Sequence, residues 1–256
     1  MSDPIIALRE LGKTFTLDGQ PLAALSGVSL EVYHEEFVSV VGRSGCGKST
    51  LVNIVAGLLP ASVGEVRVQG RVVTGPVESI GMIFQSPVLL PWRTVLDNVL
   101  LPVEIMELPR EPALRAARDL LALAGLAGFE RAYPHALSGG MQQRVAICRA
   151  LVVDPPILIM DEPFGALDAM TREEMGLELL RIWHERRKTV VFVTHSISEA
   201  VFLSDRVVVM TPRPGRVAEV LAIDLPRPRT MAARALPRFG EYEVRVRERI
   251  FEHADG

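Results

Sequence analysis

The chain has 256 residues, of which 48% are hydrophobic, and its formal net charge is -3. This length and composition suit one large α/β domain or two small ones, and the small net charge argues against a dominant nucleic-acid-binding surface. The two cysteines, Cys46 and Cys148, are too few for a disulfide framework and indicate a reducing cytosol.

The N-terminal stretch MSDPIIALRE has neither the basic segment nor the long apolar run of a signal peptide. No uncharged apolar segment of the sequence approaches the roughly 20 residues that cross a bilayer. We therefore expect the protein to act at a membrane only through partners.

Two early segments alternate partly between apolar and polar residues and contain turn residues. They are residues 5–32, from IIALRELGKTF to ALSGVSLEV, and residues 64–73, GEVRVQGRVV. This pattern predicts a small antiparallel sheet beside the core.

A glycine-rich loop lies between these two segments. The apolar run 37–41 is followed by GRSGCGKST, which fits the spacing G-x-x-x-x-G-K-[ST]. In such a loop backbone N–H groups surround phosphate oxygens, the lysine reaches the terminal phosphates, and the hydroxyl faces magnesium, while the next helix adds its positive dipole end. A chance glycine-rich turn would look similar, but strand, loop and helix occur in the required order. We predict that a nucleoside triphosphate binds here, through Gly42, Arg43, Ser44, Gly45, Cys46, Gly47, Lys48, Ser49 and Thr50.

Three further apolar runs end abruptly in polar residues. They are SIGMIFQ, which ends at Gln85, ILIMDE, which ends at Asp161 and Glu162, and VVFVTH, which ends at His195. Continuous apolar runs of this length between helices are typical of buried parallel strands, and ligands bind at the carboxyl ends of such strands. We expect these side chains to converge on the nucleotide.

The chain reads as a single domain with an insertion. Residues 1–86 and 153–215 are expected to form the nucleotide-binding core. Between them, residues 87–152 are rich in alanine and leucine at helical spacing, which predicts an inserted helical subdomain. Residues 216–256 are expected to be a short C-terminal tail, because closely spaced prolines precede a charged segment, EYEVRVRERIFEH.

The acidic pair after ILIM suits hydrolysis. A carboxylate at Asp161 can hold magnesium directly or through water, and the neighbouring Glu162 can polarise an attacking water. Two acids that begin an exposed loop would look the same, but a phosphate loop upstream favours the catalytic interpretation.

A second anion site is predicted at LSGGMQQR, residues 137–144. Ser138, Gly139 and Gly140 precede a predicted helix, so a hydroxyl and free N–H groups lie at its positive end. A flexible loop that caps a helix would look similar. One chain therefore carries two phosphate-binding helix starts, which is more than one γ-phosphate needs.

With these motifs the chain resembles the ATP-binding cassette (ABC) family of P-loop NTPases. The resemblance extends to about Gly215 and rests on Phe15, GRSGCGKS, Gln85, LSGGMQQR, ILIMDE, GALD and His195. It implies an α/β fold with a mainly parallel core sheet, an antiparallel β subdomain and an inserted helical subdomain. It also implies a head-to-tail homodimer in which each ATP lies between the phosphate loop of one copy and the signature motif LSGGMQQR of the other.

The resemblance implies further roles by position. Phe15 would stack on the adenine, and Asp168 would link the two sites. Gln85 would touch magnesium and the attacking water, and His195 would contact the γ-phosphate and help to orient the water. The implied catalytic residues are Glu162, His195 and Gln85, and the implied magnesium ligands are Ser49, Gln85 and Asp161.

Simpler interpretations exist for two of these residues. Phe15 is otherwise an ordinary core aromatic, and His195 a strand-end histidine satisfied by the backbone. Two residues depart from the family pattern, Met141 where glutamine is frequent and Ser196 where aspartate is common. Neither departure removes a proposed anion donor or the histidine.

Four phrases resemble the nitrate, sulfonate and taurine group of bacterial importers: LLPWRTVLDNV, DEPFGALDAMTR, ISEAVFLSDRV, and PRPGRV with LPRPR. This implies a peripheral subunit at the cytoplasmic face of the inner membrane, beneath two permease subunits that an extracytoplasmic solute-binding protein serves. The basic residues Arg213, Arg216, Arg227 and Arg229 form either a solvated tail or a membrane-proximal docking surface. The transported solute is not indicated.

Two other functions remain open. A soluble cassette ATPase of DNA repair or translation usually has two fused cassettes or a long coiled-coil insertion, and the sequence has neither. A regulatory module that barely hydrolyses ATP would not need Glu162. The apolar cluster 89–92, LLPW, either packs against the helical subdomain or borders a groove for a permease helix, and the resemblance favours the groove.

Overall fold

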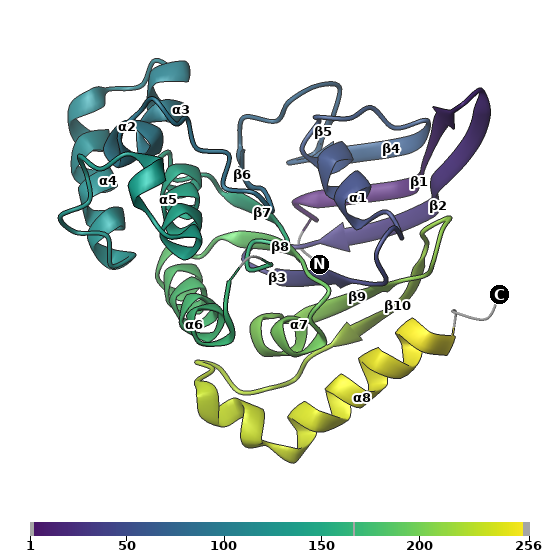
Figure 1. Cartoon of the computed structure of the whole chain (residues 1–256). Coiled ribbons are helices and arrows are strands. Elements are labelled where there is room, and N and C mark those ends of the chain that lie inside the picture. The colour runs from purple at the N-terminus through teal and green to yellow at the C-terminus, as the bar shows by residue number, and fades with distance from the viewer. Residues whose placement is uncertain (1–2, 166, 253–256) are drawn as a thin grey trace.

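The computed structural model describes residues 3–165 and 167–252. Two sheets form the centre of the molecule, with one helix packed between them, further helices on the other face of the larger sheet and a separate group of helices at one end (Figure 1). None of the helices in these two ranges combines the length and the apolar character that crossing a membrane requires. Cys46 and Cys148 are both buried as free thiols.

The smaller sheet is antiparallel and four-stranded, in the order β2-β1-β4-β5. Its strands are β1 (Ile6–Leu17), β2 (Gln20–Val32), β4 (Val63–Val68) and β5 (Arg71–Val72). Asp18 and Gly19 join β1 to β2 with φ angles of 49° and 76°, as the two-residue hairpin turn of an Asp-Gly pair requires. The predicted antiparallel sheet is confirmed.

The larger sheet has six strands in the order β10-β9-β3-β8-β7-β6. The neighbours from β9 to β6 pair in parallel, and β10 pairs with β9 antiparallel. The strands are β3 (Phe37–Val41), β6 (Ile80–Ile83), β7 (Ile157–Asp161), β8 (Thr189–Val193), β9 (Arg206–Met210) and β10 (Val217–Ala222). Every residue of β3 and β8 is buried, which explains why the strands appear in the sequence as continuous apolar runs. The predicted parallel core is confirmed.

Alternate residues of the parallel strands enter two separate hydrophobic cores. Phe37 and Phe192 face one core, and their neighbours Val38 and Val193 face the other. The first core also contains residues of α6 (Ala169–Arg186), α7 (Ile197–Leu203) and α8 (Pro237–Glu252), and the second contains α1 (Lys48–Val55) and the antiparallel sheet. The carboxyl ends of the strands are therefore held between two packed layers.

The inserted helical subdomain is confirmed between β6 and β7, at the teal end of the molecule in Figure 1. Its helices are α2 (Val95–Val99), α3 (Leu101–Ile105), α4 (Arg110–Leu123) and α5 (Gly139–Leu151). Leu121 and Leu126 are fully buried between these helices and join them to the first core.

The segment after residue 215 differs from the short tail that the sequence predicted. Its first part is β10 of the larger sheet, and α8 packs against β9 and α7 with Phe239 and Val246 buried (Figure 1). Tyr242 and Ile250 continue the same apolar stripe at helical spacing, so the charged segment is an amphipathic helix. Residues 253–256 of the predicted tail lie outside the described residues.

Two arginines of this segment are structural. Arg229 is only 5% exposed, and its guanidinium donates to the last carbonyls of α7, on Val201, Phe202 and Ser204. Burial lowers the pKa of Arg229 to about 10. Arg227 donates to Asp205 and lies 4.2 Å from the centre of the Trp183 ring. For Arg227 and Arg229, the solvated tail and the membrane-docking surface are therefore both wrong, whereas Arg213 and Arg216 are exposed.

We expect Arg229→Leu to lower the free energy of unfolding by about 3 kcal/mol, because the buried carbonyls at the end of α7 lose their donor. Urea denaturation followed by circular dichroism measures the change. The matched control is Arg216→Leu, an exposed arginine of the same basic group, with an expected change below about 0.5 kcal/mol. Equal stabilities of the two variants would contradict the capping role.

Candidate functional site

The glycine-rich loop connects the end of β3 to the start of α1, as predicted. Gly47 is the N-cap residue with a φ of 100°, and no side chain caps the helix, so the first N–H groups of α1 remain available inside the loop. A Cβ atom on Gly47 would lie 2.7 Å from Leu25 Cδ2, so both the backbone angle and the packing require glycine. The buried Lys48 Nζ donates to Gly42 O at 2.9 Å and to Arg43 O at 3.2 Å. The loop thus places backbone donors and an ammonium group around one small volume.

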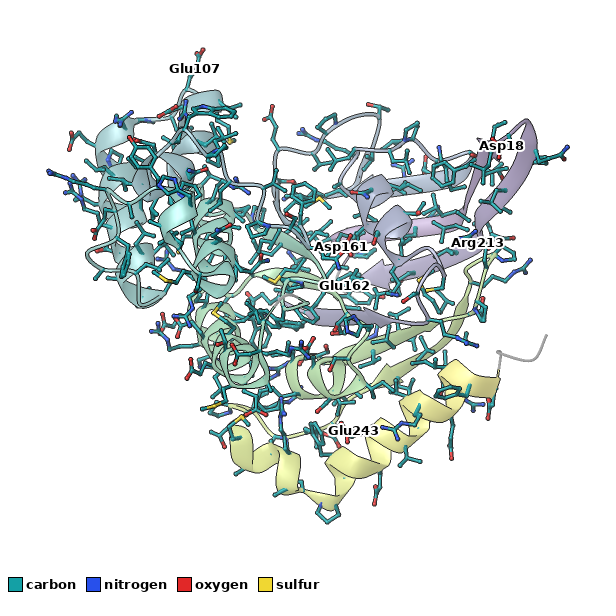
Figure 2. The ribbon with its side chains drawn as sticks, in the orientation of Figure 1. Asp18, Glu107, Asp161, Glu162, Arg213 and Glu243 are labelled. Carbon is teal, nitrogen blue, oxygen red and sulfur yellow. The ribbon has the colours of Figure 1, made fainter. Side chains whose placement is uncertain are left out.

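Asp161 and Glu162 lie at the carboxyl end of β7, near the middle of the molecule (Figure 2). Ser49 Oγ donates to Asp161 Oδ1 at 3.1 Å, which brings together two of the predicted metal ligands. Burial raises the pKa of Asp161, and the neighbouring Glu162 charge adds to this, while the Ser49 hydrogen bond and the Lys48 charge oppose it. A carboxylate in this partly desolvated position is stabilised by a nearby cation.

Glu162 is the centre of a second group. Its Oε2 lies 3.1 Å from Nδ1 of His195 and 3.5 Å from Nε2 of Gln85. Because a carboxylate only accepts hydrogen bonds, the first contact places a proton on Nδ1 of the imidazole. The three residues follow β6, β7 and β8, which are neighbours in the sheet, so the predicted convergence of strand ends is observed.

A pocket of about 370 Å³ lies between the loop and Glu162. Its lining residues are Phe15, Leu22, Ala24, Ser44, Gly45, Gly47, Lys48, Ser49, Thr50, Gln85, Glu162 and Arg213. Phe15 is 37% exposed at this pocket, and Lys13 Nζ lies 5.1 Å from its ring centre. The alternative that Phe15 is a core aromatic is therefore wrong.

Arg213 is a lining residue that the sequence interpretation placed elsewhere (Figure 2). Its Nε and Nη2 both donate to Gly45 O, at 3.3 Å. The turn that carries it packs tightly on the phosphate loop, since a Cβ atom on Gly215 would lie 2.0 Å from Cys46 O. The glycine in PRPGR indicates that another segment packs closely on this turn. The sequence does not show that this segment is the phosphate loop, because the contact depends on β9 lying beside β3.

The signature residues Ser138, Gly139 and Gly140 do not line this pocket. Ser138 caps α5, and its Oγ accepts a hydrogen bond from the N–H of Met141 at 3.3 Å. Asp168 caps α6 and accepts hydrogen bonds from Thr171, which lower the pKa of Asp168. A Cβ atom on Gly140 would lie 3.3 Å from Thr171 Cγ2, so the two helix starts are adjacent. Within one chain the predicted second anion site is thus separate from the phosphate loop.

The model of the ABC transporter family matches residues 25–165, more than half of the chain. The chain belongs to the ABC transporter family. An uncharacterized ABC transporter ATP-binding protein of Methanocaldococcus jannaschii is 50% identical over 94% of this chain and 89% of its own length. The taurine import ATP-binding protein TauB of Rhizobium johnstonii is 47% identical over 90% of this chain and 89% of its own.

Solved cassettes also match the fold of this ABC protein. The dimeric structure of a post-hydrolysis state of an ATP-binding cassette, bound to ADP and phosphate, has a TM-score of 0.76 and 35% identity and covers 85% of this chain and 98% of the other. The chain is therefore an ATP hydrolase with the cassette fold.

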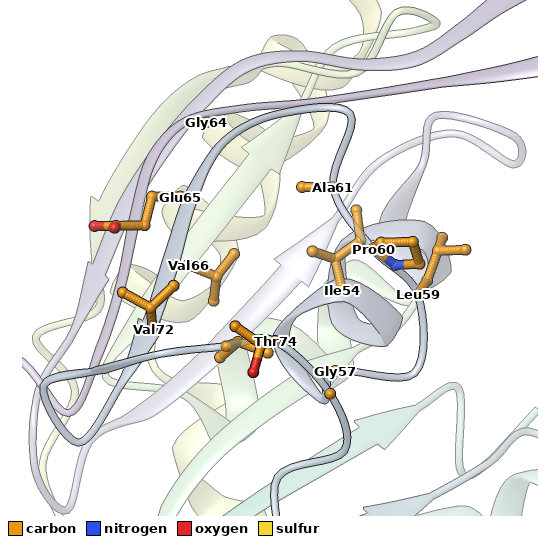
Figure 3. A pocket seen from close by; sticks show the side chains of 12 residues that line it. Ile54, Gly57, Leu59, Pro60, Ala61, Gly64, Glu65, Val66, Val72 and Thr74 are labelled. Carbon is orange, nitrogen blue, oxygen red and sulfur yellow. The ribbon is translucent and has the colours of Figure 1, made fainter.

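A second cavity of this cassette, of about 480 Å³, lies at the other end of α1 (Figure 3). Ile54, Gly57 and Val66 are among its lining residues, and Glu65, its charged residue, pairs with Arg67 at 2.6 Å. The carbonyl end of a helix repels anions, so this cavity does not suit phosphate groups. The smaller pocket, at the N-terminus of α1, is the candidate nucleotide site.

Proposed function

We propose that this cassette is the ATP-hydrolysing subunit of a bacterial importer of the nitrate, sulfonate and taurine group, and that it acts as a head-to-tail homodimer. The observation that carries the dimer is the separation of the two helix starts in one chain: α1 begins at the pocket, and α5 begins outside it. A second copy supplies the missing signature motif. The solved dimeric cassette with ADP and phosphate supports this arrangement, and the taurine import relative supports the importer group.

ATP would bind with its phosphates at residues 42–50 and its adenine on Phe15. The side chains of Ser49, Gln85 and Asp161 fit a magnesium ion, because hydroxyl, amide and carboxylate oxygens are the hard ligands that it prefers. Among the described residues no group of three or more His, Cys, Asp or Glu could hold a metal, so phosphate oxygens and water would complete the coordination. Bound magnesium neutralises charge on the terminal phosphates.

Glu162 would act as the general base for hydrolysis. Its Oε2 contacts His195 and Gln85, whereas Oε1 makes no hydrogen bond to the described residues and is available to a water molecule. His195 and Gln85 fix the direction of the carboxylate, so the water that it accepts is oriented relative to the phosphate.

The loop before α2 would dock a permease helix. Trp92 in this loop is 72% exposed, and Arg93 pairs with Glu104 at 2.6 Å. The fully buried Asn98 fixes the loop by hydrogen bonds to the N–H and the carbonyl of Leu90, at 2.7 and 3.1 Å. An exposed aromatic side chain on a fixed loop, next to the segment that carries Gln85, suits a partner that must sense the nucleotide.

We expect Trp92→Ala to weaken assembly with the permease subunits and to uncouple transport, while basal ATP hydrolysis by the isolated cassette stays intact. Co-purification and ATP-driven uptake into proteoliposomes that contain the permease and its binding protein measure both effects. The control is Val244→Ala, a 56% exposed apolar residue on α8. Arg93→Glu addresses the same surface but also breaks the pair with Glu104, so the tryptophan variant is the cleaner test.

The same assay tests the importer function, which requires that uptake by the wild-type complex depends on the cassette and on ATP.

Full transport by a folded Trp92→Ala variant would place the docking site elsewhere, and unfolding of the variant would show that Trp92 supports the fold. The cassette would lie at the cytoplasmic face of the membrane, beneath transmembrane permease subunits that select the solute together with the extracytoplasmic binding protein. Nitrate, sulfonates and taurine are the candidate solutes, and ligand binding to that protein identifies which one is carried.

A further inference from the structure

We propose that Arg172 and Glu199 are positioning residues that couple the loop at Leu167 and Asp168 to His195. The coupling rests on the proposed function, in which this loop faces the second copy and His195 contacts the nucleotide. Arg172 belongs to the first turn of α6, and Glu199 to the first turn of α7. Neither side chain lines the nucleotide pocket, so both act through other groups.

The turn that carries His195 is held by a hydrogen-bonded ring. Thr194 and Ser196 flank His195, and the N–H of Ser196 donates to Oγ1 of Thr194 at 3.0 Å. The Thr194 hydroxyl in turn donates to Oε2 of Glu199 at 2.6 Å. The N–H of Glu199 donates to Oγ of Ser196 at 3.3 Å, which caps α7. Glu199 therefore fixes both residues that flank His195, and with them the direction in which the imidazole meets Glu162.

The other oxygen of Glu199 faces α6. Its Oε1 lies 3.4 Å from Nε of Arg172, an ion pair without hydrogen-bond geometry, and Nη2 of Arg172 donates to the carbonyl of Leu167 at 3.1 Å. One guanidinium group thus touches both the loop before α6 and the carboxylate that holds the His195 turn. A displacement of the Leu167 carbonyl moves the charge that Glu199 faces.

Glu199 is 8% exposed, which distinguishes it from a surface ion pair. Burial raises the pKa of its carboxyl, and the Thr194 hydrogen bond and the Arg172 charge oppose this shift. A buried carboxylate is unfavourable unless it is paired, so Glu199 requires the Thr194 hydroxyl and the Arg172 charge that face it.

The loop at Leu167 also adjoins the signature helix. Asp168 caps α6 through Thr171, and Gly140 packs against Thr171 and Leu167. In the proposed dimer this edge meets the nucleotide of the second copy. A contact there would be transmitted from the Leu167 carbonyl through Arg172, Glu199 and Thr194 to His195, so that the histidine of one site responds to occupation of the other.

Glu199→Gln keeps an oxygen acceptor for Thr194 and removes the charge that faces Arg172. Removal of one partner of a buried ion pair lowers stability, so circular dichroism must show that the variant is folded before a lower rate is assigned to positioning. We expect the turnover number for ATP to fall roughly tenfold at unchanged ATP affinity, since small displacements of catalytic groups act on the transition state. Arg172→Met should give the same decrease, and the double variant should be no slower than the slower single variant.

The decisive comparison uses a His195→Ala background. If Arg172 and Glu199 act through the histidine, Glu199→Gln leaves the residual rate of His195→Ala unchanged. A further decrease by the same factor in that background, or a wild-type rate in the folded single variants, would overturn the coupling. Arg172→Met carries the test alone if circular dichroism shows that Glu199→Gln is unfolded.

Two control variants complete the assay. Arg181→Met removes an exposed residue of α6 that pairs with Glu178 and Glu185, and it should keep the wild-type rate. Lys48→Ala should lose hydrolysis. A normal rate in Lys48→Ala would refute the proposed nucleotide site itself, whereas its loss together with a normal rate in Glu199→Gln would refute only the coupling.

Discussion

Glu162→Gln is expected to lower ATP turnover by roughly 10²- to 10⁴-fold while ATP binding persists, because the amide keeps the shape of the side chain and loses the general base. His195 and Gln85 contact Oε2 of Glu162 and orient the carboxylate, so that Oε1 is the proposed acceptor of the proton from water. A glutamine side chain has the same shape but cannot accept this proton. Since ATP is bound but not consumed, the variant should accumulate as a nucleotide-bound dimer.

Size-exclusion chromatography with and without ATP detects this dimer, and a phosphate-release assay measures turnover. Glu241→Gln, an exposed glutamate of α8, is the matched control and should behave as wild type. A Glu162→Gln protein that stays monomeric with ATP, while the wild-type protein dimerises, would contradict the shared-site proposal. Wild-type turnover would remove Glu162 from the base role.

Lys48→Ala is expected to weaken ATP binding or productive turnover by at least roughly tenfold to a hundredfold, the equivalent of one or two charge-assisted hydrogen bonds to phosphate. The buried ammonium group donates to Gly42 and Arg43 within the loop, so it has little freedom to point elsewhere. Arg213 also contacts the loop, but it donates to Gly45 O and is exposed, whereas Lys48 is buried.

Equilibrium binding of a fluorescent ATP analogue, together with the hydrolysis assay, measures this effect. Lys13→Ala is the comparison, because Lys13 lies over Phe15 but does not line the pocket. Its effect on affinity should be small. Near-normal hydrolysis by Lys48→Ala would mean that the loop does not hold the terminal phosphates.

The local chemistry of the site was readable from short motifs. The phosphate loop needs glycine at position 47 and a lysine at the next residue, and these demands are set by backbone angles and reach within a few residues. The buried strands were equally clear, because a sheet covered on both faces requires continuous apolar runs such as 37–41 and 189–193. The convergence of Gln85, Glu162 and His195 followed from the parallel direction of their strands.

The C-terminal segment was misread for a physical reason. Its prolines and charged residues describe local conformation and solvation, but they do not show that Arg229 reaches the carbonyl end of α7. The same limit applies to Arg213, whose contact with Gly45 depends on the turn after β9 lying over the phosphate loop. The sequence around an arginine does not predict which hydrogen-bond acceptor its side chain contacts in the folded protein.

The amino-acid order therefore contains the nucleotide-binding loop, the acidic pair, the signature motif and the strands between them, since each depends on interactions among residues close in the chain. The folded arrangement adds what depends on distant partners: the capping of α7 by Arg229, the position of Arg213, and the path from Leu167 to His195. It also separates the two helix N-termini of one chain that are predicted to bind anions, those of α1 and α5, a relation that no local pattern encodes. Long-range packing between two hydrophobic cores sets these distances, and it fixes them only when the whole sheet has formed.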